Sequence, residues 1–278
     1  MMHITGTKVR ILASPDAWFI ANGESYYDGG GYNHGKLKPF FAMIEVKNST
    51  ITDLKVLNTP AHAFMLAECY DSYFDNFQVD DAYGDDTKHR GKNTDGIHIL
   101  QSQRITITNA KIHNQDDCAC ITSGVDVKIS GFSCNGGGFS VGSMGGNTDN
   151  TVKRVSFSKS TLANGWYGCL IKAWPGRIAV VDHVTFEDII LRDVRQQGIA
   201  VTQGYTNAGL YSKAGKGVSI TNVHFKNIGG HVLDTGQKML LNCAKHECGK
   251  NTVVFENIDI SGGKRTLMIS SPPITLTN

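Results

Sequence analysis

The sequence has no large excess of charge of either sign. Its 278 residues include 27 lysines and arginines against 25 aspartates and glutamates, which gives a net charge of +2, and charged residues make up only 19% of the chain. A domain that binds nucleic acid generally presents a strongly basic face to the phosphate backbone. We therefore expect no nucleic-acid partner.

Long apolar segments are also absent. No run approaches the roughly 20 residues that a membrane-spanning helix needs. The opening residues MMHITGTKVRILA lack the apolar core of a secretory signal peptide. We therefore expect no membrane partner. The same residues already have a strand-like pattern, so we expect that further residues precede them in the full protein.

Zinc-binding patterns are missing among the seven cysteines. A structural zinc site takes paired Cys-x-x-Cys or mixed Cys and His clusters, and the cysteine spacings here fit neither. Cys243 and Cys248 are close enough in sequence for a small disulfide loop, and Cys118 and Cys134 could close a loop of about one structural repeat. The alternative is a set of reduced, buried thiols in a cytosolic protein. The remaining cysteines are Cys69, Cys120 and Cys169.

Short alternating segments, each one or two strands long, recur along the whole chain. Each ends in Asn, Gly or Asp, which suit tight turns, and glycine accounts for 31 of the 278 residues. The repeats are spaced by about 22 to 37 residues, with no helical pattern between them. The segments are 49–58, 72–81, 103–114, 125–136, 150–164, 181–194, 216–230 and 251–263.

This regular spacing favours one all-β domain over residues 1–278, a right-handed parallel β-helix. In that fold each turn of the chain, called a coil here, stacks on the previous one about 4.8 Å away. The alternative is a β-sandwich. Its strands usually come as hairpins with two-residue turns, and the sequence has few of those.

Stacked coils would bring three aspartates together. Asp116 and Asp117 adjoin in NQDDCACI at the start of an apolar run, and Asp95 comes about 21 residues before Asp116. With coils of that length, Asp95, Asp116 and Gly137 would stack on one face. Adjacent strand residues point to opposite faces, so both neighbouring aspartates can face outward only if the chain bends there, as at a turn or bulge.

A cluster of three carboxylates permits three interpretations. Carboxylates several ångströms apart can hydrolyse a glycosidic bond, because one of them stays protonated beside its negative neighbours and acts as the acid while the others activate water. Three carboxylates also suit calcium, which takes oxygen ligands. The third interpretation is structural, with each aspartate stabilising a turn at a corner of the β-helix.

Several motifs occur together in a fixed order. They are NTDG (93–96), QDD (115–117), GFSVGSMGG (138–146), DNTVKRVSF (149–157), IKAWPG (171–176) and CAKHEC (243–248). Through them the chain resembles glycoside hydrolase family 28, the polygalacturonases, from about residue 21 to residue 264. The family fold is the right-handed parallel β-helix, usually with further N-terminal coils and a cap, so we expect such coils before residue 1.

The resemblance also implies an activity and its setting. Members of this family are secreted enzymes that cut α-1,4-linked galacturonate in pectin with inversion and without a metal ion. We therefore expect an extracellular, monomeric hydrolase of galacturonan with no cofactor, and a plant polygalacturonase-inhibiting protein as a further partner.

The resemblance implies a role for each matching residue. Asp116 resembles the general acid, and Asp95 and Asp117 resemble the pair that activates water. Lys172 matches a lysine that meets a substrate carboxylate, a reasonable task for an ammonium group beside an acidic polymer. Tyr205, in VTQGYTN, resembles a tyrosine that lines the same cleft.

Further residues follow from the same resemblance. Asn93, in the NTDG motif, and Gly137 are expected on the substrate-binding surface. Two cysteine pairs resemble family disulfides, which leaves the other three cysteines as buried thiols. The expected disulfides are Cys118–Cys134 and Cys243–Cys248.

Two positions depart from the family pattern. Gly137 stands where the family has a histidine, and Leu170 stands where it has an arginine. Losing a guanidinium that clamps a carboxylate should weaken substrate binding by several kcal/mol. Three interpretations remain open. The chain is a polygalacturonase that is slow or holds its substrate differently, a hydrolase of rhamnogalacturonan or another substituted pectin, or a pseudoenzyme that binds pectin fragments or an inhibitor protein without turnover.

Overall fold

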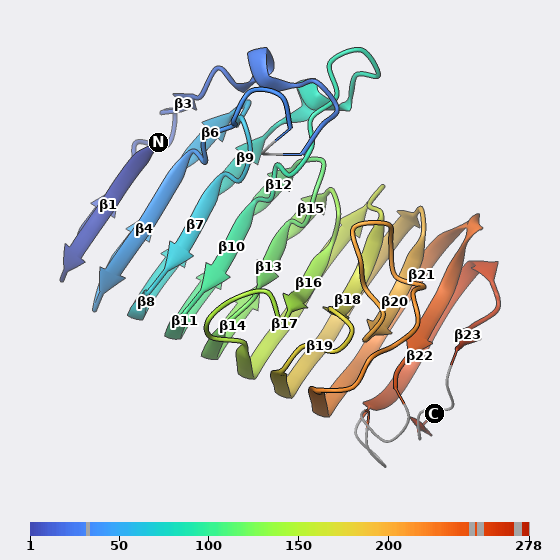
Figure 1. Ribbon diagram of the computed structural model, residues 1–278. Helices are drawn as coiled ribbons and strands as arrows, with labels where there is room; N and C mark the ends of the chain where they lie inside the picture. The colour runs from blue at the N-terminus through green and yellow to red at the C-terminus, as the bar shows by residue number, and fades with distance from the viewer. Residues whose placement is uncertain (32–33, 245–247, 249–252, 270–273, 278) are drawn as a thin grey trace.

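The computed structural model confirms the predicted parallel β-helix, with its coils stacked side by side from the N-terminus to the C-terminus (Figure 1). It describes residues 1–31, 34–244, 248, 253–269 and 274–277. Helical structure in these residues is confined to two short 3-10 turns, η1 (Gly23–Tyr26) and η2 (Ala82–Asp85). Among them, no helix has the length and apolar character to cross a membrane.

Three columns of parallel strands form the sides of the coils. The first column contains β1 (Met2–Thr7), β4 (Ala42–Lys47), β7 (Phe64–Ala67), β10 (Ile97–Leu100), β13 (Ala119–Ile121), β16 (Phe139–Met144), β18 (Tyr167–Ala173), β20 (Gln197–Thr202) and β23 (Leu267–Met268). The second contains β2 (Arg10–Leu12), β5 (Thr50–Thr52), β8 (Tyr70–Asp75), β11 (Ser102–Thr108), β14 (Gly124–Ser130), β17 (Thr151–Ala163), β19 (Ala179–Val194), β21 (Val218–Asn242), β22 (Val253–Lys264) and β24 (Ile274–Thr277).

The third column begins with short strands and continues in longer ones. Its separate strands are β3 (Phe19–Ile20), β6 (Lys55–Leu57), β9 (Gln78–Asp80), β12 (Lys111–His113) and β15 (Ser133–Asn135). Beyond β15 the column is continued by the later part of β17, the later part of β19 and the middle of β21. The last residues of β21 turn into the first column, between β20 and β23.

Phenylalanines stack in register through the core of the later coils. Phe157, Phe186, Phe225 and Phe255 are aligned on successive strands, all four are buried, and neighbouring rings are nearly parallel with centroids 4.8, 5.1 and 5.2 Å apart. These separations are close to the spacing of neighbouring strands. Each ring therefore lies on the ring of the next coil, which fixes the register between coils.

Asparagine and aspartate occupy corners of the coils in the left-handed backbone conformation, as the strand-ending Asn and Asp residues predict. Asp188, Asn227 and Asn257 have φ values of 55°, 51° and 51°. The amide of Asn227 donates to Oδ1 of Asp188 at 2.8 Å, and that of Asn257 donates to Oδ1 of Asn227 at 2.9 Å. These residue types tolerate the left-handed region because their short polar side chains bond locally.

The register of the early coils differs by one residue from the prediction. Ile97 pairs with Ala119, and the amide of Gly96 donates to the carbonyl of Asp117 at 2.9 Å. Asp95 therefore stacks beside Asp117 and not beside Asp116. The physical reason is the bend at Gln115 and Asp116, which takes Asp116 out of the strand alignment.

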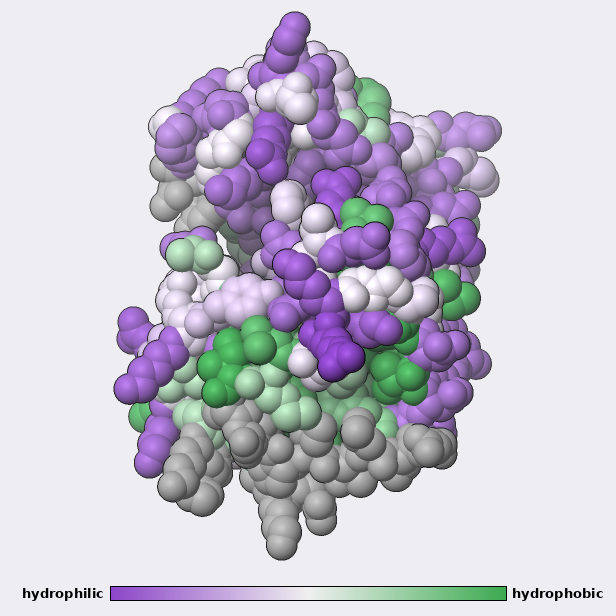
Figure 2. Space-filling view, turned by 90° about the vertical axis from the view of Figure 1, so that its right-hand side faces the viewer, coloured by the Kyte–Doolittle hydropathy of each residue, from purple (hydrophilic) through white to green (hydrophobic). Residues whose placement is uncertain are grey.

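The end of the β-helix that carries the last coils has a hydrophilic part and an apolar part. Figure 2 shows hydrophobic residues gathered in the lower part of this face and hydrophilic residues above them. Met268 and Ile269 are exposed large hydrophobic residues of these coils.

Candidate active site

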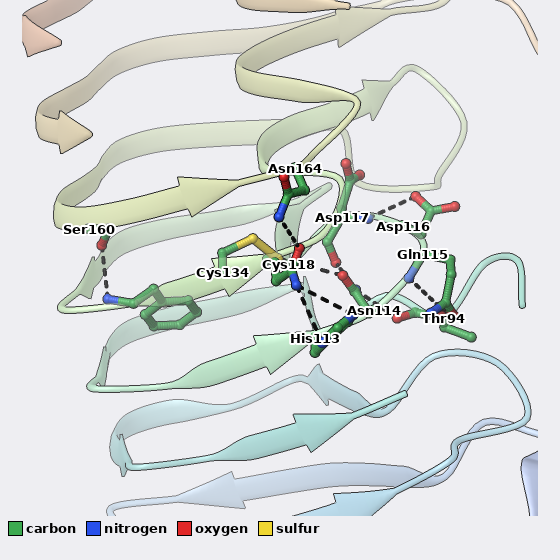
Figure 3. Close-up of a disulfide and its surroundings, with 12 residues drawn as sticks. Thr94, His113, Asn114, Gln115, Asp116, Asp117, Cys118, Cys134, Ser160 and Asn164 are labelled. Atoms are coloured by element: carbon green, nitrogen blue, oxygen red, sulfur yellow. Dashed lines mark hydrogen bonds between the residues drawn. A yellow bond between two sulfur atoms is a disulfide. The ribbon is translucent and has the colours of Figure 1, made fainter. Parts of the chain in front are cut away.

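Three aspartates gather where β10 and β13 begin. Asp95 lies just before β10 and Asp117 just before β13, and their residues are only 6% and 4% exposed. The chain bends at Asp116, as two outward-facing neighbours require, and Figure 3 shows the side chains of Asp116 and Asp117 leaving the chain at this bend. The carboxylates lie close enough for Asp95 and Asp117 to raise the pKa of Asp116.

Asp116 is held by two hydrogen bonds in a partly buried position. Its Oδ2 accepts from the side-chain amide of Asn93 at 3.1 Å, and its Oδ1 accepts from the backbone N–H of Asp117 at 2.9 Å. Burial, followed by the charges of Asp95 and Asp117, raises the pKa of Asp116 to about 7. A carboxyl group with such a pKa keeps its proton in mildly acidic solution, as a general acid must.

Asp117 is the aspartate that pairs with a cation. Its Oδ2 accepts from Oγ of Ser140 at 2.6 Å and from Nζ of Lys172 at 2.8 Å. Burial disfavours the charged form of Lys172, but the carboxylates of Asp117 and Asp116 outweigh it and raise the pKa of Lys172 above its usual value. The site therefore holds a buried ion pair in contact with the aspartate cluster.

Asp95 is a buried carboxyl group, like Asp117. Burial, with the charge of Asp117 next in size, raises its pKa to about 7. The thiol of Cys120 donates to its Oδ2 at 3.5 Å. Its Oδ1 lies 3.4 Å from Nε2 of His62 and is a buried oxygen without a well-formed hydrogen bond to the described residues.

Lys172 and Tyr205 lie next to the aspartates, where the sequence predicts them. Nζ of Lys172 is 5.4 Å from the centre of the Tyr205 ring, and that ring meets Trp174 edge-on with centroids 5.0 Å apart. Burial raises the pKa of Tyr205, with further contributions from the aspartates against an opposing one from Lys172. An aromatic wall and a cation therefore face the carboxyl cluster.

Leu170, which stands where the family has an arginine, is packed among apolar side chains. Leu170 is 1% exposed and forms a small hydrophobic cluster with Ala200, Leu210 and Leu240, against which Tyr205 packs. A guanidinium at this position would have to be buried among these side chains. The cluster therefore replaces a charged contact with an apolar surface beside Lys172.

The departure at Gly137 has a steric cause. A Cβ atom added to Gly137 would lie 2.6 Å from the backbone carbon and oxygen of Asp116 and 2.8 Å from the nitrogen of Asp117. The amide of Gly137 also donates to the carbonyl of Asp116 at 2.6 Å. The backbone of this coil presses on the aspartate bend, so a side chain here would displace it.

The structure contains both disulfides. Cys118–Cys134 lies directly behind the aspartate bend (Figure 3), and Cys243 is joined to Cys248. Asn114 supports the same bend, since its amide donates to the carbonyls of Thr94 at 2.7 Å and Asp117 at 3.0 Å. Residues 245–247 of the CAKHEC motif lie outside the described residues. The free cysteines are Cys69, Cys120 and Cys169, all buried.

Gln115 connects the bend to a neighbouring loop, a role that the sequence does not reveal although QDD contains this residue. Its Nε2 donates to the carbonyl of Asp81 at 2.7 Å and to Oδ1 of Asp85 at 3.0 Å, and its Oε1 accepts from Oγ1 of Thr94 at 3.0 Å. These hydrogen bonds fix η2, and with it the start of the loop that follows, against the aspartate bend. Its cationic residues, called the basic loop here, are Lys88, Arg90 and Lys92.

A hollow of about 450 Å³ opens at the basic loop. Its walls include the three cations of this loop together with Asp28, His34 and the glycines 29–31. The basic loop runs directly into Asn93, whose amide holds Asp116. Positive charge thus flanks the carboxyl cluster on the side of the early coils.

Two groups of side chains have the atom types of metal ligands. Donor atoms of His62, Asp95 and His98 lie within 4.8 Å of one another, and so do those of Asp95, Asp117 and Cys120. Both groups include an aspartate of the cluster and already interact among themselves. We assign neither group to a metal ion. The sequence analysis did not identify His62 or Ser140, which the stacking of neighbouring coils brings here. Nor did it identify His98 and Cys120, which lie in β10 and β13 shortly after Asp95 and Asp117.

Comparisons with known proteins agree on one family. The model of the glycosyl hydrolases family 28 matches residues 1–277. A polygalacturonase of Cochliobolus carbonum is 37% identical over 96% of this chain and 72% of its own length, and endopolygalacturonase B of Aspergillus niger is 35% identical over 98% and 74%. The structure of endopolygalacturonase I from Stereum purpureum, complexed with two galacturonates, superposes with a TM-score of 0.87 at 28% identity, covering 99% of this chain and 81% of that one.

Proposed function

The chain belongs to the glycosyl hydrolases family 28 and is a polygalacturonase-like hydrolase of pectin, and we propose that it cleaves α-1,4-galacturonosyl linkages by single displacement with its three aspartates. One observation carries this proposal. A carboxyl group with a pKa of about 7, Asp116, lies beside a carboxylate that is paired with a cation, Asp117. Such neighbouring groups can divide the acid and base roles of glycoside hydrolysis.

In the proposed reaction Asp116 protonates the glycosidic oxygen while the bond between this oxygen and the anomeric carbon breaks. A water molecule attacks the anomeric carbon from the opposite face, and one of its protons passes to the pair formed by Asp95 and Asp117, which then releases it to solvent. The configuration at the anomeric carbon is thereby inverted. The bond that forms joins water oxygen to carbon, and the proton that Asp116 loses is replaced from solvent.

The charges around the cluster fit an acidic polymer. Lys172 and the basic loop supply cations on two sides of the carboxyl groups, while Tyr205 and Trp174 supply a surface against which a sugar ring can pack. We propose that these cations bind galacturonate carboxylates in place of the arginine that Leu170 replaces. Gly137 would contribute to substrate binding by allowing the shape of the aspartate bend, and Asn93 would contribute by holding Asp116 in position.

The test is a measurement of new reducing ends with polygalacturonate and, in parallel, with rhamnogalacturonan. We expect release from polygalacturonate, and a decrease of about 10² to 10⁴ in rate for Asp116→Asn, the usual contribution of a general acid. Full activity of Asp116→Asn on either polymer would contradict the assignment of the acid. Absence of release from both by a folded wild-type chain would contradict the proposed function.

One observation favours a second candidate substrate. The apolar cluster around Leu170 lies where a charged contact is expected, so the site suits a pectin with fewer free carboxylates at that position. Release of reducing ends from rhamnogalacturonan alone would support this alternative.

We also propose that residues 1–278 act as one domain and as an extracellular monomer, and that a plant polygalacturonase-inhibiting protein binds it. An extracellular location fits the two disulfides, because such bonds persist in oxidising environments.

Light scattering at several protein concentrations tests whether the chain is a monomer, and a dimer would contradict this proposal. Inhibition of polygalacturonate hydrolysis by the purified inhibitor tests that partner.

A further inference from the structure

The position that carries Asp95 and Asp117 recurs on the later coils of the first column. Asp95 lies two residues before Ile97, and Asp117 lies two residues before Ala119, the partner of Ile97 on the next coil. The same position on each later coil is occupied, in order, by Gly137, Tyr167, Gln197 and Gln237. The surface that bears the carboxyl groups therefore continues as a row of uncharged side chains over β18, β20 and the end of β21.

Tyr211 reaches this row from the opposite edge of the column. It belongs to the loop 203–217 between β20 and β21, which folds back across the first-column strands (Figure 1). Its hydroxyl donates to Oε1 of Gln237 at 2.8 Å and accepts a hydrogen bond from the amide of Gln197, the first residue of β20. The hydroxyl of Tyr211 is thus fixed at the strand beginnings, the same edge at which Asp95 and Asp117 lie.

The backbone beside Tyr211 is fixed at the other edge. The carbonyl of Leu210 accepts from Oγ1 of Thr202 at 2.8 Å and from the amide of Asn242 at 3.2 Å, and these two residues end β20 and β21. The side chain of Leu210 is 1% exposed and belongs to the apolar cluster around Leu170. Tyr211 therefore lies across the width of the first column and is held at both ends.

The ring of Tyr211 is nevertheless open to solvent, since this residue is 49% exposed. Its partner Gln197 is only 3% exposed, and Oε1 of Gln197 is buried without a hydrogen bond to the described residues. Whichever way this amide is turned, only one of its two polar atoms meets the hydroxyl of Tyr211. An unpaired buried polar atom lowers stability, and such departures are expected at functional sites. Gln197 therefore holds an exposed ring in place at some expense of stability.

We propose, on the basis of the proposed function, that Tyr211 is a substrate-binding residue on which a sugar ring of the pectin backbone packs. Gln197 lies three coils from Asp117, which places this subsite roughly 14 Å from the reacting bond on the side of the later coils. An aromatic ring that is already fixed loses little freedom when it binds. Its contact with a sugar ring needs no charge. The subsite therefore accepts a galacturonate unit whether its carboxyl group is free or esterified.

The first test is the KM of Tyr211→Ala on polygalacturonate at low and at high salt. We expect KM to rise about three- to tenfold, the usual size of one aromatic contact, with little change in kcat because the ring is remote from the reacting bond. The rise should be equal at both salt concentrations, since salt screens contacts between charges and not the packing of rings. The unchanged kcat would also show that the variant is folded.

Tyr73→Ala is the matched control, because Tyr73 is 39% exposed and its hydroxyl pairs with Oγ1 of Thr108 at 2.8 Å in the second column. Its KM should equal that of the wild type. Tyr211→Phe keeps the ring and removes the hydroxyl, so its KM should lie closer to the wild type than that of Tyr211→Ala. An unchanged KM in Tyr211→Ala, an equal rise in both variants of Tyr211, or a rise that disappears at high salt would each overturn the proposal.

A second measurement needs no turnover. Calorimetry gives the Kd of polygalacturonate for Asp116→Asn with and without Tyr211→Ala, and the double variant should bind about three- to tenfold more weakly. Equal affinities would overturn the proposal. Weaker binding on removal of Tyr211, in a chain whose wild type releases no reducing ends, would support this subsite and contradict only the proposed hydrolysis.

Discussion

The ion pair between Lys172 and Asp117 offers the sharpest test of how the active site is held together. Nζ and Oδ2 lie 2.8 Å apart, and the two side chains are only 12% and 5% exposed. The change to make is Lys172→Met, which keeps the volume of the side chain and removes its charge. We expect it to destabilise the fold, because Asp117 is then left as a buried carboxylate with Ser140 as its remaining donor among the described side chains.

The magnitude follows from the burial of both partners. Removing one member of a buried pair costs about 3–5 kcal/mol, because the other charge stays behind without compensation. Because the pKa of Lys172 is raised, its ammonium is charged in the native state throughout the acidic and neutral range, so the effect should be present in full near neutrality. Adding Asp117→Asn to Lys172→Met removes the uncompensated carboxylate. The double variant should therefore recover part of the lost free energy of unfolding.

The assay is urea denaturation followed by circular dichroism. Lys226→Met is the matched control, since Nζ of Lys226 lies 3.5 and 3.6 Å from the carboxylates of Glu187 and Glu256 on the surface. Solvent screens such pairs, so this variant should unfold at nearly the wild-type urea concentration. An equal decrease in the free energy of unfolding for Lys172→Met and Lys226→Met would refute the reasoning. So would a Lys172→Met/Asp117→Asn double variant that is less stable than Lys172→Met alone.

Three further predictions follow from the same geometry. Since the general acid must be protonated and burial raises the pKa of Asp116 to about 7, kcat/KM on polygalacturonate should fall above that pH, and a profile that is flat from about pH 4 to 8 would contradict this role. Replacing the three cations of the basic loop by glutamine should raise KM and weaken its dependence on salt, while an unchanged KM would argue against substrate contact there. Gly137→Ala should lower both the melting temperature and kcat because its Cβ meets the backbone of Asp116, whereas Gly146→Ala, with its nearest neighbour 3.8 Å away, should not.

The architecture could be predicted from the sequence because each coil repeats the same local chemistry. Alternating apolar residues bounded by Asn, Asp and Gly mark the strands and corners, and residues such as Asn227 and Asp188 occupy those corners in the structure. The aspartate cluster followed from the same stacking rule. The predicted register was wrong by one residue, because a bend at Gln115 and Asp116 shifts the alignment and has no periodic signal.

The contacts around the aspartates could not be predicted in the same way. His62 and Ser140 come from the coils on either side of Asp95 and Asp117, and their approach depends on the lengths of the loops between them. The sequence does show that Gly137 and Leu170 depart from the family pattern. Only the structure shows that the first is excluded by backbone contact and that the second belongs to an apolar cluster.

The aligned phenylalanines have a consequence for how such a protein can change. Phe186 and Phe225 stack face to face although a much longer segment separates them than separates Ile97 from Ala119. Extra residues are therefore accommodated in the loops, while each strand returns to the same place above the previous one. Loops that border the substrate can lengthen or shorten without moving the carboxyl groups, so specificity for different pectins can diverge while the catalytic geometry stays fixed.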